Sequence, residues 1–449
     1  MEEFVVRVLV ADNPWLESLA GGTVGTGEKG DINAWYNKFV PENYIERTIR
    51  LEPDHRASLV VGPRQVGKST LIWKYFSQKG KGIKPVLFLN CEEPALRQWL
   101  TSPALVWDGL SRLVDHPVPL FFEEVQQLPE AGLFLKGLVD KRIGVPIIAT
   151  GSSSFDLESK TRESLAGRAV RYLMLPLSLQ EAVKKGQDSR VMQERHYSTR
   201  MQEMICYGGY PTVLLSKNPQ NELAGLVESF IIRDASDRFR IRYPAAFRKL
   251  MELSASQIGN ICNYSEWAAL TGISNDTVSE YINLLEETHV IKLLRPFIGG
   301  KRAELTSAPK VYFIDNGIRN VVFGGFGSVE NRSDKGALWE NFAFSEIYKV
   351  INPLLDTIHY WRSKGGAEVD FVIKSRGRIA ACEIKSGDPR GKLSRASRSF
   401  IEAYQPSLFL TASSHLHPSF LLGATQVRFI RLFELAQVVK EWLNKGMAE

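Results

Sequence analysis

Residues 57–70 read ASLVVGPRQVGKST, a short apolar run that leads into a glycine-rich turn and then into the helical pattern LIWKYF. The turn matches the phosphate-binding pattern G-x-x-x-x-G-K-[ST], which requires a strand before it and a helix after it. Gly62 and Gly67 let the backbone turn tightly, so that N–H groups and the helix N-terminus face the α- and β-phosphates. Lys68 adds a positive charge toward the β- and γ-phosphates, and Ser69 offers a hydroxyl to Mg²⁺. The alternative, a chance Gly-Lys turn before a helix, is disfavoured by the correct flanks.

This stretch therefore predicts a nucleotide site with ATP and Mg²⁺ as cofactors. The predicted nucleotide-binding residues are Gly62, Pro63, Arg64, Gln65, Val66, Gly67, Lys68, Ser69 and Thr70.

A second strand has to bring carboxylates to the phosphates, and VPLFFEEVQQLP (118–129) is the only good candidate. We assign Glu123, with Ser69, to the Mg²⁺ shell, with water between Glu123 and the ion, and Glu124 to polarising the attacking water. Glu123 stands where such strands usually carry Asp, and its longer side chain makes hydrolysis a weaker prediction than binding. An acidic strand end beside a helix is the alternative.

Two further segments offer polar side chains to the same site. The apolar run VPIIATGSSS (145–154) ends in hydroxyls, of which Ser152 could sense the γ-phosphate or only cap a turn. Downstream, Arg168 and Arg171 could act as an arginine finger toward a neighbouring subunit, as a sensor in the same subunit, or be a solvated pair. The predicted catalytic residues are Lys68, Glu124, Ser152 and Arg168.

The surrounding sequence predicts an α/β fold. The short apolar runs ASLVVG, PVLFLN, VPLFFEEV and VPIIATGS alternate with helical stretches over 57–155, which is typical of a parallel sheet buried on both faces. The 449 residues suffice for two to four domains. The predicted divisions are an N-terminal extension with a Gly-rich stretch (1–38), a P-loop ATPase domain (39–205), a helical and winged-helix region (206–305) and a C-terminal α/β domain (306–449).

Composition bounds the class of protein without naming a partner. Apolar content of 44%, charged content of 24% and a net charge of +6 are ordinary for a globular chain and compatible with nucleic acid. The four cysteines are far apart, which predicts free thiols in a reducing compartment and no zinc site. The sequence shows neither a signal peptide nor 18 consecutive apolar residues, so we expect a cytoplasmic protein without a membrane span.

A helix–turn–helix pattern lies in the middle of the chain, over SEWAALTGISNDTVSEYINLLEE (265–287). Gly272 makes the turn, Ser274 caps the second helix, and VIKLLRPF after it reads as a wing strand. The second helix exposes acidic and amide side chains, which favours a structural or protein-contacting role over DNA reading. Basic residues gather instead before it and could follow a phosphate backbone or form a solvated face; they are Arg233, Arg238, Arg240, Arg242, Arg248 and Lys249.

The ordered set GPRQVGKST, FFEEVQQLP, ATGSSS, ESLAGR, MLPLSLQEA, YGGYP and EVDFVI…CEIKSG carries a resemblance over residues 40–390. It resembles a bacterial and archaeal family of AAA+-like P-loop ATPases fused to a C-terminal domain of unassigned function. The resemblance implies an ATPase core, a winged-helix middle and a C-terminal domain similar to the PD-(D/E)xK, or restriction-endonuclease-like, fold. Glu123 departs from the family pattern, which usually has Asp.

The hairpin EVDFVIKSRGRIAACEIKSG (368–387) is the predicted nuclease-like site. A two-residue turn at Arg376-Gly377 makes paired residue numbers sum to 753, which sets Asp370 opposite Glu383 and Glu368 opposite Lys385 on one polar face. The other face is apolar. Two carboxylates so close can hold Mg²⁺, and Lys385 could orient the water. A preceding helix offers the third carboxylate. The predicted nuclease residues are Glu340, Asp370, Glu383 and Lys385, with Glu346 as second choice for the helix. A plain Glu368–Lys385 ion pair is the alternative.

These observations predict an ATP-binding and ATP-hydrolysing switch or motor acting on nucleic acid, with DNA favoured. The basic stretch after the hairpin, KSGDPRGKLSRASRS (385–399), suits a phosphate-rich partner. The alternative is an ATPase that senses or remodels a protein partner while its C-terminal fold is catalytically idle. Arg168 also makes a homo-oligomer possible. A P-loop kinase for a small molecule is disfavoured by the large C-terminal half.

Overall fold

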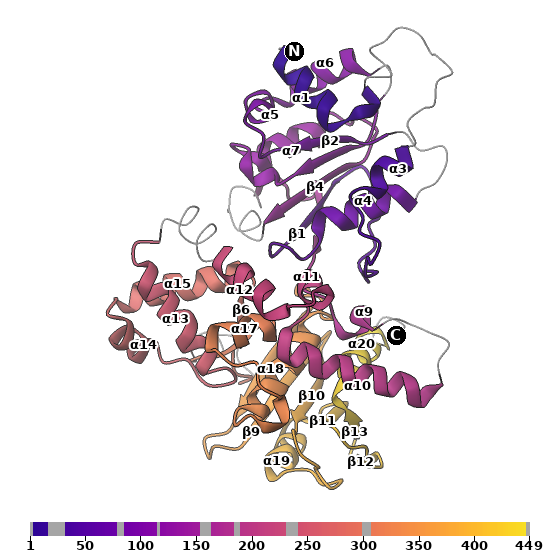
Figure 1. Cartoon of the computed structure of the whole chain (residues 1–449). Helices are drawn as coiled ribbons and strands as arrows, with labels where there is room; N and C mark the ends of the chain where they lie inside the picture. The colour runs from indigo at the N-terminus through magenta and orange to yellow at the C-terminus, as the bar shows by residue number, and fades with distance from the viewer. Residues whose placement is uncertain are drawn as a thin grey trace. The chain divides into compact units, whose positions relative to one another are not determined.

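The computed structural model describes residues 3–16, 32–78, 85–114, 117–152, 163–183, 189–229, 241–298 and 307–445, and structural statements refer to these. The chain divides into two compact units, Met1–Leu175 and Pro176–Glu449 (Figure 1). The boundary predicted near 205 falls inside helix α10 (Arg190–Tyr207). The second predicted boundary, near 305, lies between two paired strands, β6 (Ile291–Leu294) and β7 (Lys310–Phe313). The helical region and the C-terminal sheet therefore belong to one compact unit.

The first unit is built on a five-stranded sheet in the order β2-β3-β4-β1-β5. Its strands are β1 (Ala57–Gly62), β2 (Leu87–Asn90), β3 (Leu120–Glu123), β4 (Ile147–Ser152) and β5 (Ala169–Leu173). Every pair in this sheet is parallel, which confirms the α/β prediction. Since parallel strands end at the same edge, the phosphate loop after β1 and the carboxylates at the end of β3 lie at one edge of the sheet.

Helices bury both faces of this sheet, as the short continuous apolar strands predict. One face packs against α1 (Glu3–Asp12), α5 (Pro94–Trp99), α6 (Pro103–Leu113) and α7 (Ala131–Asp140). The other face packs against α3 (Ile32–Asn37) and α4 (Lys68–Gln78), which lie side by side (Figure 1). On that face Trp73 of α4 has its ring centroid 5.1 Å from Phe88 and 5.3 Å from Phe121.

The N-terminal segment is part of this unit, so the prediction of an extension outside the ATPase domain is wrong for its described residues. Val5 and Leu9 of α1 are buried in the hydrophobic cluster of the sheet. The Asn13 side chain donates to the Phe88 carbonyl (2.9 Å) and accepts from the Phe88 N–H (2.7 Å). Trp15 donates to the Val86 carbonyl at 3.1 Å. These side chains satisfy backbone groups along edge strand β2, which would otherwise be open to another strand.

The second unit begins with helices. They are α9 (Leu179–Ala182), α10 (Arg190–Tyr207), α11 (Pro211–Leu215), α12 (Pro219–Ser229), α13 (Pro244–Ser256), α14 (Tyr264–Thr271) and α15 (Asn275–Glu287). Gly272 ends α14 in the left-handed conformation, and the Ser274 side chain accepts from the Thr277 N–H at the start of α15. The predicted helix, turn, helix and strand are therefore confirmed, ending in β6. Whether they function as a winged helix stays a prediction.

The second unit ends in a mixed six-stranded sheet in the order β12-β13-β11-β10-β9-β8. Its strands are β8 (Asp356–Arg362), β9 (Glu368–Ser375), β10 (Arg378–Ile384), β11 (Leu408–Ser413), β12 (Phe420–Leu422) and β13 (Thr425–Arg431). The helices of this part of the chain are α17 (Asn316–Phe323), α18 (Lys335–Tyr348), α19 (Arg395–Tyr404) and α20 (Leu435–Lys445).

The register predicted for the β9–β10 hairpin is confirmed for the five pairs nearest the turn, whereas the predicted pairs Asp370–Glu383 and Glu368–Lys385 lie beyond the paired residues. The ladder runs from Ser375↔Arg378 to Phe371↔Cys382, each pair summing to 753. Arg376 and Gly377 have φ of 48° and 77°, as a two-residue turn of this twist requires. Phe371, Ile373, Ala380 and Cys382 of the predicted apolar face are buried. The prediction that the opposite face is polar is wrong, because Val372 and Ala381 on that face are buried in a cluster with Phe400 of α19. The carboxylates lie only at the open end of the hairpin.

Candidate functional site

The phosphate loop joins β1 to α4 through backbone conformations that its glycines permit. Gly62 has φ of +149° and Gly67 φ of +92°. A Cβ on Gly62 would lie 2.0 Å from the carbonyl oxygen of Met174, the residue that follows β5. Gln65 at the tip of the loop also has a positive φ, of 59°. The loop is therefore shaped by close backbone approach, as the sequence predicts.

Lys68 lies inside this loop. Its residue is 6% exposed, and its Nζ donates to the carbonyl oxygens of Gly62 (3.1 Å) and Pro63 (2.9 Å). A buried ammonium needs such partners, because moving it out of water without hydrogen-bond partners costs several kcal/mol. The two carbonyls hold the charge at the mouth of the loop, where phosphate oxygens are stronger acceptors than neutral carbonyls.

Ser69 and Glu123 meet across the site, although 54 residues separate them in the chain. The Ser69 hydroxyl donates to the Glu123 carboxylate. Burial raises the pKa of Glu123, and the bond from Ser69 lowers it in part. A hydroxyl and a carboxylate at the edge of a phosphate loop are the hard oxygen ligands that Mg²⁺ takes together with phosphates. These two residues fit the ion, and they would hold it against the β- and γ-phosphates.

Glu124 follows β3 in the left-handed conformation, with φ of 51° and ψ of 48°. Its N–H donates to the Thr150 hydroxyl of β4 at 2.9 Å, and its carboxylate accepts from the Gln126 side chain. The two neighbouring carboxylates therefore have different partners, Ser69 for Glu123 and Gln126 for Glu124. The sequence reading missed Thr150 and Gln126, although both lie within the quoted strand motifs. Ser152 ends β4 and pairs with Gly62 along the backbone, and its side chain lies outside the described residues.

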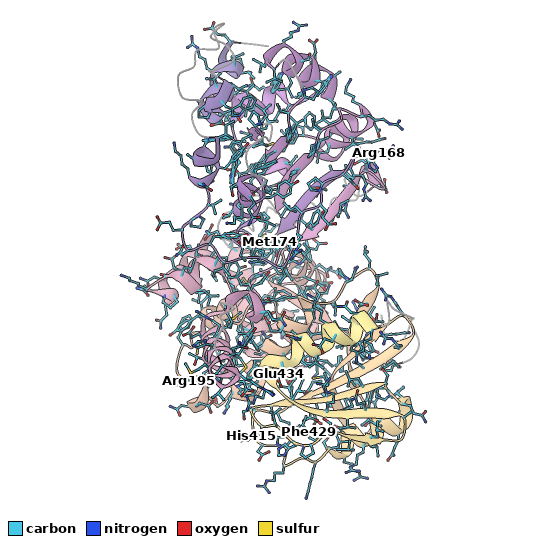
Figure 2. The ribbon with its side chains drawn as sticks, turned by 90° about the vertical axis from the view of Figure 1, so that its right-hand side faces the viewer. Arg168, Met174, Arg195, His415, Phe429 and Glu434 are labelled. Carbon is cyan, nitrogen blue, oxygen red and sulfur yellow. The ribbon has the colours of Figure 1, made fainter. Side chains whose placement is uncertain are left out.

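Arg168 lies at the other end of β5 from the phosphate loop. Figure 2 labels Arg168 and Met174, which flank the strand at its start and its end. The start of β5 pairs with Ala57, five residues before Gly62 on β1, or about 16 Å at 3.3 Å per residue. Arg171 pairs with Leu59, midway along the same strand. Arg168 therefore cannot act as a sensor on the phosphates of its own chain; the role toward a neighbouring subunit stays a prediction.

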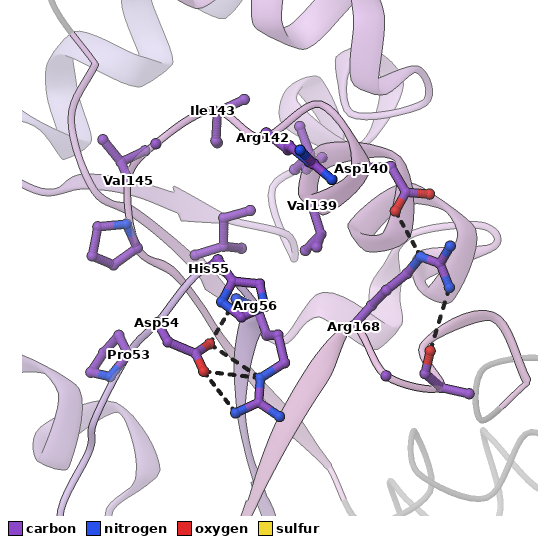
Figure 3. A pocket seen from close by; sticks show the side chains of 16 residues that line it. Pro53, Asp54, His55, Arg56, Val139, Asp140, Arg142, Ile143, Val145 and Arg168 are labelled. Carbon is purple, nitrogen blue, oxygen red and sulfur yellow. Dashed lines mark hydrogen bonds and ion pairs between the residues drawn. The ribbon is translucent and has the colours of Figure 1, made fainter.

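A cavity of about 970 Å³ opens beside Arg168, at the edge of the sheet where β1, β4 and β5 begin (Figure 3). Arg168 Nε donates to Asp140 at 2.7 Å, and Arg56 forms an ion pair with Asp54 at 2.7 Å. Arg142 also lines this cavity and is exposed. The cavity is lined by both charge signs and belongs to the edge of the sheet away from the phosphate loop.

Arg168→Ala tests the remaining role. Because Arg168 lies far from its own phosphate loop, we expect ATP affinity to change by less than about twofold. If it serves a neighbouring subunit, hydrolysis falls by roughly 10³-fold or more. A mixture of Arg168→Ala and Glu124→Gln chains should then recover activity. Arg142→Ala, in the same cavity, is the matched control. Unchanged hydrolysis by Arg168→Ala would contradict the finger role.

The predicted nuclease residues come together at the open end of the C-terminal hairpin, with one addition. Glu340 of α18 accepts from the Tyr312 hydroxyl at 2.5 Å and lies 3.7 Å from Lys310 Nζ. Lys310 also forms an ion pair with Glu368. Burial raises the pKa of Asp370 well above its usual range, and Glu340 raises it further. The sequence reading missed Lys310, the first residue of β7.

Glu383 and Lys385 pair with each other rather than across the strands. Lys385 Nζ lies 2.6 Å from Glu383 Oε1, and Ser397 of α19 donates to the other Glu383 oxygen. The alternative of a Glu368–Lys385 ion pair is therefore wrong. Asp370 accepts from the Ile384 N–H at 2.7 Å, which caps the ladder.

Glu346 has a structural role in this structure. Its carboxylate accepts from the Leu179 N–H at 2.9 Å and pairs with Lys349 at 2.8 Å. The helix α18 therefore contributes Glu340 to the cluster, as the first choice predicted. Within the described ranges, no three His, Cys, Asp or Glu side chains are arranged to hold a metal ion. As arranged, the cluster does not fit a divalent cation.

The YGGYP motif is also structural. The Gly209 N–H donates to Asp315 at 2.7 Å, and a Cβ on Gly208 would lie 1.9 Å from the same carboxylate. Asp315 also caps α17 by accepting from the N–H groups of Gly317 and Ile318. The two glycines therefore let the end of α10 approach a buried carboxylate.

Basic side chains predicted to face a partner are placed as follows. Arg242, Arg248 and Lys249 are exposed at or just before α13, whereas Arg233, Arg238 and Arg240 lie outside the described residues. A second group, here called the basic strip, follows β10. Its members are all exposed: Lys385, Arg390, Lys392, Arg395 and Arg398.

The chain is similar to known families over most of its length. A family model described as "AAA domain" matches residues 54–183. Two models described as "Domain of unknown function", DUF8612 and DUF4143, match residues 198–328 and 335–418. An uncharacterized protein of Mycobacterium tuberculosis is 27% identical over 340 residues, covering 74% of this chain and 71% of that protein. One of Haemophilus influenzae is 26% identical over 365 residues, covering 76% of this chain and 86% of that protein.

Solved structures give only distant likeness. The replication initiator DnaA bound to AMPPCP and single-stranded DNA is 13% identical with a TM-score of 0.26, covering 56% of this chain and 92% of that chain. C. elegans PCH-2 is 16% identical with a TM-score of 0.23, covering 61% of this chain and 68% of that chain. At these values the superpositions carry no functional conclusion. In the described part of the chain, every helix is too short or too polar to cross a membrane. The match to the model described as AAA domain and the five-stranded parallel sheet are both consistent with a P-loop NTPase core in the first unit.

Proposed function

We propose that this protein binds Mg²⁺-ATP at the phosphate loop, hydrolyses it, and acts as a switch on nucleic acid, with a nuclease-like C-terminal domain. The observation that carries the ATPase part is the contact between the Ser69 hydroxyl and the Glu123 carboxylate beside the buried Lys68. A hydroxyl, a carboxylate and an ammonium from separate segments converge where strand and helix form an anion site.

Each residue has a separate task in this proposal. Lys68 moves from the loop carbonyls to the β- and γ-phosphates, and the loop N–H groups bind the remaining phosphate oxygens. Ser69 and Glu123 hold Mg²⁺, which when bound neutralises charge on the phosphates. Glu124 accepts a proton from the attacking water once its carboxylate leaves Gln126. Thr150 fixes the Glu124 backbone and so aims that carboxylate.

The nucleic-acid part rests on the basic strip. Lys385 is paired with Glu383, but among the described residues no carboxylate forms an ion pair with the other four members. Exposed cations without acidic partners gain most from phosphate contact, because binding releases counterions. The strip lies next to the carboxylate cluster through Glu383 and Ser397, so a bound strand would pass near it.

The double variant Arg395→Ala/Arg398→Ala tests this surface. We expect affinity for a short DNA duplex to fall roughly tenfold, and the slope of log K against log salt to shrink by about 2, because two phosphate contacts are lost. Fluorescence anisotropy at several salt concentrations measures both. Lys440→Ala/Lys445→Ala on α20 removes the same charge elsewhere in the same unit and should change neither. An unchanged salt slope in the arginine variant would contradict the proposed surface.

A second candidate is an ATPase that acts on a protein partner. The exposed face of α15 favours it, because Asp276, Glu280 and Glu287 would repel a phosphate backbone. Steady-state ATP hydrolysis with and without DNA separates the two candidates. Stimulation by DNA that weakens with salt supports the first, and a rate indifferent to DNA supports the second.

A further inference from the structure

Lys310 lies inside the carboxylate cluster, between Glu340 and Glu368. Its residue is 2% exposed. Its Nζ is ion-paired with Glu368, lies 3.7 Å from Glu340 Oε1, and is 5.3 Å from the ring centroid of Tyr360. A lysine is almost never buried unless it is paired, and here its partners come from α18 and β9.

Other donors of the protein also contact the carboxylates of this cluster. Tyr312 donates to Glu340, the Ile384 N–H donates to Asp370, and Glu383 is held by both Ser397 and Lys385. A divalent ion would have to displace several of these bonds. It would also have to approach the positive charge of Lys310, which repels it in a poorly hydrated site.

We propose that Lys310 is an internal cation that closes the carboxylate cluster to divalent metal ions, so that the nuclease-like site is autoinhibited by its own chain. The proposal goes beyond the proposed ATPase function and concerns metal access to the second unit. In the resting molecule the ammonium offsets part of the negative charge of Glu368 and Glu340, as a metal ion would otherwise do.

The backbone of Lys310 is attached to the helix–turn–helix segment. Lys310 pairs with Leu294 of β6, which follows α15, and forms a bridge with Ile261, which precedes α14. The Cys262 N–H donates to the Pro309 carbonyl at 2.8 Å. Lys310 is therefore held between the two ends of the α14–α15 pair. A partner that shifts this pair would withdraw the ammonium and leave Glu340, Glu368 and Asp370 open to a cation.

Metal binding by the nucleotide-free full chain tests the proposal without relying on cleavage. Mn²⁺ is titrated and the free ion is counted by electron paramagnetic resonance. We expect the wild type to show no submillimolar site in this cluster. Lys310→Met should create one Mn²⁺ site per chain, because the carboxylates lose their internal cation. Its affinity should be at least tenfold higher than any Mn²⁺ binding by this cluster in the wild type. Adding Asp370→Asn to that variant should abolish the new site.

Lys292→Met is the matched control, because Lys292 is also partly buried and ion-paired, to Glu286 at 2.5 Å, on the neighbouring strand. It should leave Mn²⁺ binding unchanged. Lys310→Gln, which keeps a donor for Glu368, provides a second variant if Lys310→Met fails to fold by circular dichroism. A submillimolar wild-type site that Asp370→Asn removes would overturn the proposal, as would folded Lys310 variants that gain no site. A failure of the ATPase proposal would be seen in nucleotide binding and would leave these results unaffected.

Discussion

Lys68→Ala is expected to weaken ATP binding by roughly 10²-fold and to abolish measurable hydrolysis. The variant removes the one ammonium at the mouth of the described phosphate loop, and bonds from a charged group to phosphate contribute about 1.5–3 kcal/mol each. The same side chain also ties the carbonyls of Gly62 and Pro63 together, so the loop loses order as well as charge. Titration with a fluorescent ATP analogue measures affinity, and phosphate release measures turnover.

Lys74→Ala is the matched control for this prediction. Lys74 lies on the same helix α4, six residues later, and its ion pair with Glu46 at 3.7 Å is partly solvent-exposed. An exposed pair of this kind contributes at most about 1 kcal/mol, and it does not reach the loop. Both variants should keep the thermal unfolding transition of the first unit. Unchanged nucleotide affinity in a folded Lys68→Ala chain would show that the phosphate-loop assignment is wrong.

The phosphate loop could be predicted from sequence because all of its information is local. Spacing from Gly62 to Ser69 fixes a turn, and the apolar run before it fixes the strand. The N-terminal segment could not be predicted in this way. Asn13 contacts Phe88, 75 residues away, and one amide side chain on the edge of a strand leaves no periodic signal in the sequence. A Gly-rich stretch between Leu16 and Ile32 made the segment look separate.

The contacts within the C-terminal carboxylate cluster could also be predicted only in part from the sequence. Register next to the turn followed from Arg376-Gly377, because a two-residue loop sets the first pairs after it, and the pairing ends at Phe371↔Cys382 before it reaches the carboxylates. The ion pairs could not be predicted from the register, because side chains at the open end of the hairpin can also pair with residues from other helices and strands. Lys310 comes from a strand 58 residues before Glu368, and nothing in its local sequence marks it as their common cation. The possible sensor role of Arg168 was wrong for a similar reason. A sequence motif shows the order of residues along the chain, but it does not show at which edge of the sheet a residue lies.

The two adjacent carboxylates Glu123 and Glu124 should separate binding from chemistry. We expect Glu124→Gln to keep ATP affinity within about threefold while hydrolysis falls by roughly 10²–10⁴-fold, the usual contribution of a general base. Glu123→Gln should instead weaken binding of ATP in the presence of Mg²⁺, with a smaller change in its absence. The reason is geometric: the Glu123 carboxylate accepts from Ser69, whereas the Glu124 carboxylate accepts from Gln126.

Single-turnover hydrolysis after rapid mixing, together with equilibrium titration at high and low Mg²⁺, measures both effects. Glu130→Gln is the control, because Glu130 is exposed and also has a left-handed backbone, with φ of 52°.

If both variants lose the same step, the two carboxylates act as one unit and the proposed separation of their roles is wrong. If Glu123→Gln alone stops hydrolysis while Glu124→Gln is active, the roles are exchanged, and the contact between Ser69 and Glu123 would then hold the base rather than the ion. The left-handed conformation of Glu124 is the feature that argues against that exchange. Non-glycine residues adopt this conformation at a cost of about 1 kcal/mol or more, and here it is held by Thr150 at the edge of the sheet that carries the phosphate loop.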